Sequence, residues 1–161
     1  CGMVLLAAPG RRLGEVLRSQ LSGNPNNVPY LDTFMTAIDT LERGGEVDVT
    51  DAGPIVRQLF APQVQGFLRD LFSHDPAAMI ASVNVPVLIV HGGRDLQVGR
   101  EDADLLHGAK PDAARVDLDE MNHVLKAVPD SVPANLASYA DPSLPLAAGL
   151  VDAIVDFVSA R

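Results

Sequence analysis

The sequence predicts an α/β fold, in which parallel strands alternate with helices. Three apolar runs of strand-like composition lie at residues 2–8, 86–91 and 114–118. The first run is apolar at consecutive positions, which is typical of a strand buried on both faces of a parallel sheet. Helical patterns at residues 98–109 and 146–158 separate and follow the strands. This alternation indicates a doubly wound layer rather than a sandwich of two sheets.

A long segment without any strand pattern separates the first strand from the second. It is far longer than one crossover helix requires, and prolines near the starts of its shorter periodic stretches are typical of helix N-termini. We therefore predict a sheet domain at residues 1–10 and 84–161 and an all-helical insertion at residues 11–83. Helices are expected at residues 10–22, 29–43, 54–60, 62–72 and 76–83.

Composition narrows the classes of function. The 161 residues are 47% hydrophobic and 20% charged, which favours one globular domain with a substantial core. Twelve Lys plus Arg against 21 Asp plus Glu give a net charge of −9, so binding to nucleic acid or to an anionic membrane is not expected. The apolar runs are shorter than the roughly 18 residues that span a bilayer. The single cysteine, Cys1, excludes an internal disulfide.

Two candidate catalytic residues follow neighbouring strands. Asp95 comes after the strand at 86–91 and a Gly-Gly pair, and His123 comes after the strand at 114–118. The carboxyl ends of parallel strands share one edge of a sheet, where ligands bind in open α/β folds. An aspartate there can hold a histidine in one tautomer and stabilise its cation. The alternative role for Asp95 is to cap the following helix.

Taken together, these stretches resemble the C-terminal half of an α/β-hydrolase, in the group of serine esterases, lipases and peptidases. The resemblance is carried by the first strand with Ala-Ala-Pro-Gly at 7–10, by Gly-Gly-Arg-Asp at 92–95 and by Met-Asn-His at 121–123. It implies that Asp95 is the triad acid, that His123 is the base, and that the helical insertion is the cap or lid. The implied substrate is a small ester or a similar acyl compound, and the implied chemistry requires no cofactor and no metal.

The chain departs from this family in one respect. The family's nucleophile lies in a Gly-x-Ser-x-Gly elbow before the strand that here comes first, and no serine of this sequence lies in such a motif. The oxyanion-hole amides would also lie upstream. We therefore predict a fragment of a serine hydrolase that supplies Asp95 and His123 and is catalytically silent by itself. Two alternatives stay open: a non-catalytic binding module, and a hydrolase with an aspartate nucleophile, as in dehalogenases and epoxide hydrolases.

Other titratable residues have simpler interpretations. Asp117 and Asp119 are the substitutes if Asp95 is not the acid. We interpret His91 as a buried or hydrogen-bonded residue, His74 as a loop or capping residue and His107 as a solvated one. No histidine spacing typical of a metal site is present, so a metal is not expected.

Two further features of the sequence have competing interpretations. Cys1 could act as an N-terminal nucleophile, but the parallel-type strand that follows it favours an ordinary residue. Lys126, close after His123, is interpreted as a surface residue. The insertion is rich in aromatic side chains, which we interpret mainly as packing residues, with a lid over an acyl pocket as the alternative; they are Tyr30, Phe34, Phe60, Phe67 and Phe72.

The first strand is also predicted to mediate self-association. If no strand pairs with its outer side, that edge is apolar and unpaired, which favours association with another chain. A two-fold dimer that joins the first strands into one continuous sheet is the expected form. The low cysteine content fits the cytoplasm but also permits a periplasmic or secreted protein.

Overall fold

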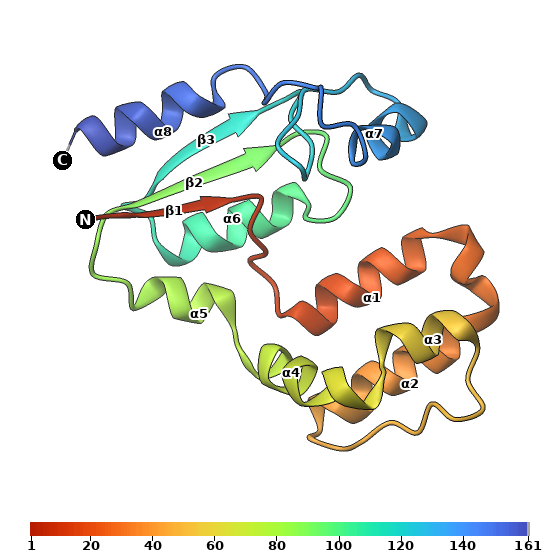
Figure 1. Cartoon of the computed structure of the whole chain (residues 1–161). Coiled ribbons are helices and arrows are strands. Elements are labelled where there is room, and N and C mark those ends of the chain that lie inside the picture. Colours follow the sequence, from red (N-terminus) through yellow and green to blue (C-terminus); the bar gives the residue numbers. More distant parts are fainter. Residues whose placement is uncertain (161) are drawn as a thin grey trace. The chain divides into compact units, whose positions relative to one another are not determined.

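The computed structural model describes residues 1–160 and contains a parallel three-stranded sheet. The strands are β1 (Met3–Leu6), β2 (Val87–Gly92) and β3 (Ala114–Leu118), in the spatial order β1-β2-β3 (Figure 1). Leu5 is paired with Ile89, which in turn is paired with Arg115. All three strands and their parallel direction agree with the sequence-based prediction.

Helices cover both faces of the sheet. Successive side chains of β2 alternate between the faces: Ile89 packs with α5 (Pro76–Ala81) and α6 (Arg100–Ala109), whereas Leu88 packs with α8 (Leu150–Ser159). Figure 1 shows α6 and α8 on opposite sides of the sheet. Because both faces are covered, every residue of β2 is buried, which explains its continuous apolar run.

A second compact unit, Arg11–Asp75, contains helices and loops but no strand among its residues, all of which the structure describes. It contains α1 (Leu13–Gly23), the 3₁₀ helix η1 (Pro25–Tyr30), α2 (Leu31–Glu42), α3 (Pro54–Leu59) and α4 (Pro62–Ser73). Its core includes three of the four phenylalanines of this segment, whereas Phe67 is 63% exposed. Packing, as interpreted from the sequence, therefore accounts for most of its aromatic residues; those in the core are Phe34, Phe60 and Phe72.

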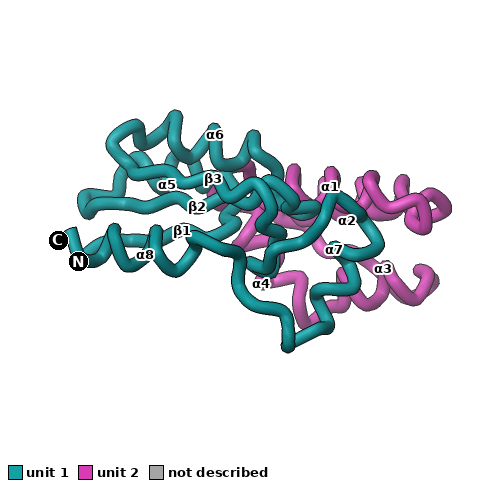
Figure 2. The backbone as a smooth tube through the Cα atoms, turned by 90° about the horizontal axis from the view of Figure 1, so that it is seen from above, with its two compact units in different colours: residues 1–10, 76–161 teal, residues 11–75 magenta. Residues whose placement is uncertain are grey.

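The boundary between the two units differs from the predicted one. The helical unit comprises Arg11–Asp75, and the sheet unit comprises Cys1–Gly10 and Pro76–Arg161 (Figure 2). The predicted insertion extended to residue 83 and included the helix now seen as α5. That helix belongs to the sheet unit because Ile80 and Val83 pack in the same apolar cluster as Ile89 and Leu106.

Several local features were not predicted. A helix, α7 (Val132–Ser138), follows β3, and the predicted helix at 29–43 is preceded by the 3₁₀ turn η1. After β3, two isolated antiparallel bridges join Met121 to Ala127 and, across α7, Lys126 to Leu146. In the described part of the chain, no helix combines the length and the hydropathy needed to cross a bilayer.

Candidate active site

Asp95 lies in a tight turn directly after β2. Its backbone amide donates to the carbonyl of Gly92 at 3.1 Å. Its Oδ1 atom accepts hydrogen bonds from the backbone amides of Gln97, at 2.8 Å, and Val98, at 2.9 Å. These bonds orient the carboxyl group and satisfy one oxygen, so Oδ2 is the oxygen that is directed to another partner. The side chain is fully buried.

The glycine pair before Asp95 allows two loops to approach closely. The amide of Gly93 donates to the carbonyl of Leu118 at 2.9 Å, and the amide of Arg94 donates to that of Met121 at 2.9 Å. A Cβ atom on Gly92 would lie 2.3 Å from the carbonyl oxygen of Met121. Glycine is therefore needed here because any larger residue would push the loop after β3 away from the turn that holds Asp95.

His123 is presented by a three-residue hairpin loop. The amide of Asn122 donates to the carbonyl of Lys126 at 3.0 Å, and the amide of Leu125 donates to that of Asn122 at 2.9 Å. Leu125 has a φ of 65°. This is the left-handed conformation that closes hairpins of this length, and glycine usually occupies the position. The side chain of Leu125 packs against the core under α8, which helps to hold the loop in this conformation.

Asp95 and His123 meet although they are 28 positions apart. The Nδ1 atom of His123 is 2.9 Å from Oδ2 of Asp95. An ionised carboxylate only accepts hydrogen bonds, so Nδ1 carries the proton and Nε2 of the neutral ring carries the lone pair. The hydrogen bond that His123 donates to Asp95 raises the pKa of His123, and burial opposes this effect. The imidazole is partly exposed, so it combines a fixed orientation with access to solvent.

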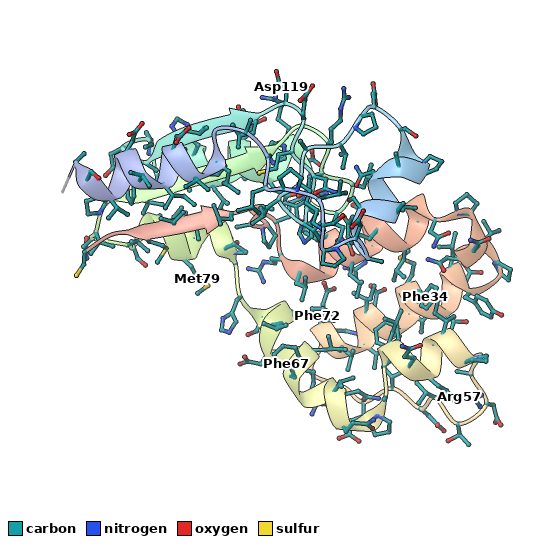
Figure 3. All side chains as sticks on the ribbon, turned by 45° about the horizontal axis from the view of Figure 1, so that its top comes forward. Phe34, Arg57, Phe67, Phe72, Met79 and Asp119 are labelled. Carbon is teal, nitrogen blue, oxygen red and sulfur yellow. The ribbon has the colours of Figure 1, made fainter. Side chains whose placement is uncertain are left out.

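The two alternative acids do not reach the histidine. Asp117 is paired with Arg100 and Arg115, each at 3.1 Å. Asp119 is exposed, and its label stands at the top of the view in Figure 3. Among residues 1–160, Asp95 is therefore the acid that the fold brings to His123.

The remaining histidines do not form a site. His91 is buried in β2, and burial lowers its pKa. His74 lies 3.5 Å from Asp70, one helical turn away, and His107 is on α6. Within the described residues, no group of three or more histidine, cysteine or acidic side chains could hold a metal ion.

Sequence reasoning missed the polar residues that surround the pair. Asn122 and Asn135 are buried and hydrogen-bonded to each other. Lys126 is not a simple surface residue, because its ammonium group donates to backbone carbonyls of Ser138 and Asp141. An asparagine beside a histidine carries no periodic signal, and α7 is too short to show one, so a single sequence offered no means of finding this cluster.

Comparisons with known proteins place this geometry in context. No family model matches the chain. In sequence it is 29% identical, over 133 residues, to Esterase EstD of Thermotoga maritima, and the match covers 77% of this chain and 29% of that protein. The chain has a partial α/β-hydrolase fold. It spans less than a third of the curated relative that it matches.

Solved structures with lower similarity include two bacterial enzymes. A hydrolase from Pseudomonas aeruginosa PA01 matches with a TM-score of 0.44 and 17% identity, over 96% of this chain and 54% of that one. The enol-lactonase from Burkholderia xenovorans LB400 matches with a TM-score of 0.42 and 16% identity, over 98% and 56%.

Among residues 1–160, no serine hydroxyl is hydrogen-bonded to His123. Ser138, at the C-terminal end of α7, is buried and accepts a hydrogen bond from Asn122 while donating one to the carbonyl of Asn135. Within residues 1–160, the hydrogen-bonded pair of Asp95 and His123 therefore has no serine hydroxyl as a further hydrogen-bond partner.

Proposed function

We propose that Asp95 and His123 are the acid and the base of a Ser-His-Asp triad, in a hydrolase that acts on ester or similar acyl substrates. The observation that carries the proposal is the 2.9 Å contact between Nδ1 of His123 and Oδ2 of Asp95. Two backbone amides on the other carboxyl oxygen support it, because they orient the acid. The sequence similarity to an esterase supports the reaction class.

The chemistry follows from the tautomer. With the proton on Nδ1, the lone pair of Nε2 accepts the proton of a serine hydroxyl as its oxygen attacks the acyl carbon. The resulting imidazolium returns that proton to the leaving group as the bond from the acyl carbon to the leaving group breaks. Water then repeats the sequence on the acyl-enzyme and regenerates the serine. Asp95 stabilises the cation in both halves and does not take up the proton.

The direct test uses the protein that contains these residues as the cell translates it. Asp95→Asn is expected to lower kcat for p-nitrophenyl esters by about 10⁴-fold, because the histidine then takes the wrong tautomer. Asp119→Asn, which changes an exposed acid near the same loops, is the matched control and should leave kcat unchanged. Retention of full activity by Asp95→Asn would show that the acid has been assigned wrongly.

The class of nucleophile is tested separately. A fluorophosphonate reacts with an activated serine. Labelling of the protein that the cell translates with these residues is therefore expected to require His123 and to disappear in His123→Ala. The 161-residue chain by itself is expected to be neither labelled nor active on esters, since no serine hydroxyl among residues 1–160 is hydrogen-bonded to His123. Ester hydrolysis by this chain that is abolished in His123→Ala would contradict that expectation. Ester hydrolysis by the protein as translated in the cell, without any labelling, would favour an aspartate nucleophile instead.

A further inference from the structure

We propose that Asn135, acting through Asn122, is a positioning residue that holds Asp95 and His123 at hydrogen-bonding distance. This inference rests on the proposed function of the pair, and it concerns residues that do not touch either reacting group. Asn135 lies on α7 and Asn122 immediately precedes His123. Their side-chain amides connect the turn that carries the acid with the hairpin that carries the base.

The connection is a continuous series of hydrogen bonds. Nδ2 of Asn135 donates to the carbonyl oxygen of Arg94 at 2.7 Å. Oδ1 of Asn135 accepts from Nδ2 of Asn122 at 3.1 Å. Oδ1 of Asn122 accepts from the backbone amide of Lys126 at 3.0 Å. The series therefore runs from the residue before Asp95 to the residue that closes the hairpin around His123.

The backbone groups at its two ends determine the direction of every bond. A carbonyl only accepts, so the nitrogen of the Asn135 amide must face Arg94. A backbone amide only donates, so the oxygen of the Asn122 amide must face Lys126. The second hydrogen of the Asn122 amide goes to Ser138 Oγ at 2.7 Å. Each amide thus has one possible orientation, and a buried amide without its partners would be costly.

The series complements the backbone contacts between the same two loops. Gly93 and Arg94 already bond to the segment that precedes Asn122, so the loops are joined on one side of the acid–base pair. The amides add a second connection on the other side of His123, through Lys126. Because both loops are held at two points, the contact between Asp95 and His123 does not depend only on its own hydrogen bond.

Further contacts hold α7 in place against both loops. The ammonium group of Lys126 donates to the carbonyl of Ser138 at 2.9 Å and to that of Asp141, near the end of the helix. On the side of the acid, Nε2 of Gln97 donates to the hydroxyl of Tyr139 at 3.1 Å. These bonds give Asn135 a defined position from which to align the two loops.

The test measures the pKa of His123 by NMR titration in the 161-residue chain. Asp95→Asn defines the value without the acid. We expect Asn135→Ala to lower the pKa of His123 by at least half of the difference between the parent chain and Asp95→Asn. Ser138→Ala, which removes one partner of Asn122, should lower it by less and serves as the milder variant if Asn135→Ala does not fold.

The matched control is Asn27→Ala. Asn27 is also a buried asparagine whose amide donates to a backbone carbonyl, that of Leu21 at 3.1 Å, but it lies in the helical unit. Its loss should lower thermal stability without moving the pKa of His123. An unchanged His123 pKa in folded Asn135→Ala or Ser138→Ala would overturn the inference, because a purely structural residue would behave in that way.

Kinetics separate this inference from the proposed function. In the natural translation product, Asn135→Ala is expected to lower kcat about 10- to 100-fold with KM nearly unchanged, since misplacement of a catalytic group costs rate more than binding. If Asp95→Asn abolishes activity and Asn135→Ala does not reduce it, the proposed function stands and the inference fails. If Asn135→Ala moves the His123 pKa while Asp95→Asn leaves activity unchanged, the positioning role stands and the function fails.

Discussion

The sheet unit and the helical unit use buried amide side chains in different ways. In the helical unit, Gln65 bonds only to backbone groups of nearby segments, with Nε2 donating to the carbonyls of Val47 and Phe60 at 2.8 Å. In the sheet unit, Asn122 and Asn135 bond to each other as well as to the backbone. The first arrangement fastens a loop to its own core. The second aligns two loops that carry titratable groups, so a buried amide can serve stability in one unit and site geometry in the other.

The largest expected effect is loss of a core side chain in the helical unit. Phe34 is fully buried and its ring lies 6.3 Å from that of Phe60. Phe34→Ala should destabilise this unit by about 3–5 kcal/mol, as measured by hydrogen exchange of α2. Phe67→Ala, at a 63% exposed position of the same unit, is the control and should change stability by less than about 0.5 kcal/mol. A simultaneous loss of protection in β2 would show that the two units do not unfold separately.

The same substitution is expected to have opposite effects in the two units. Gly92→Ala places a Cβ atom against the carbonyl of Met121, so it should destabilise the sheet unit by about 1–3 kcal/mol and lower the pKa of His123. Gly66→Ala lies on α4, where a Cβ meets nothing within 4 Å, and should stabilise the helical unit by up to about 1 kcal/mol. Denaturant unfolding of both variants measures these values. Equal effects would contradict the close approach of the two loops.

Two histidines of the sheet unit should give opposite pH dependences of stability. The pKa of His123 is raised by Asp95. The contribution of His123 to the free energy of unfolding is therefore largest below about pH 6.5 and is lost as the pH rises through its folded-state pKa. The pKa of His91 is lowered by burial. The contribution of His91 to the free energy of unfolding is therefore largest above about pH 6.5 and is lost as the pH falls through its folded-state pKa.

Thermal unfolding at several pH values separates these contributions. Asp95→Asn should lower the midpoint more at acidic than at alkaline pH, whereas His91→Gln should reduce the loss of stability on the acidic side. Phe34→Ala provides the comparison from the helical unit, because an apolar deletion should lower stability similarly at every pH. An Asp95→Asn effect that is independent of pH would mean that the hydrogen bond to His123 does not persist in solution.

The smallest expected effect on stability concerns the outer edge of β1. Within residues 1–160, no strand pairs with that edge, and the prediction of a two-fold dimer through it stays untested. Met3 and Ala7 donate their amides toward β2, so the amide of Val4 points outward. Val4→Pro should therefore weaken a dimer while sparing the contacts with β2, and Val4→Ala controls for the lost side chain. A strictly monomeric parent chain in sedimentation at tens of micromolar would contradict the prediction.

The sequence allowed prediction of the strands, most helices and the two candidate catalytic residues. Continuous apolar runs identified β1 and β2 because strands covered on both faces have no polar side to maintain. Asp95 and His123 were predicted together because each follows one of two strands that end at the same edge. The compact units divide at residue 75 and not at the predicted residue 83, since periodicity shows that a segment is helical but not which core it joins. The packing of Ile80 against the sheet shows that α5 belongs to the sheet unit.

The sequence by itself determined which residues could arrive at the carboxyl edge of the sheet, because strand periodicity and turn residues are local properties of the chain. Only the tertiary structure decided that Asp95, and not Asp117 or Asp119, bonds to His123. That outcome depends on the close approach at Gly92 and on the amides of Asn122 and Asn135, which are contacts between segments distant in sequence. Their geometry follows from packing in three dimensions, and no pattern of neighbouring residues encodes it.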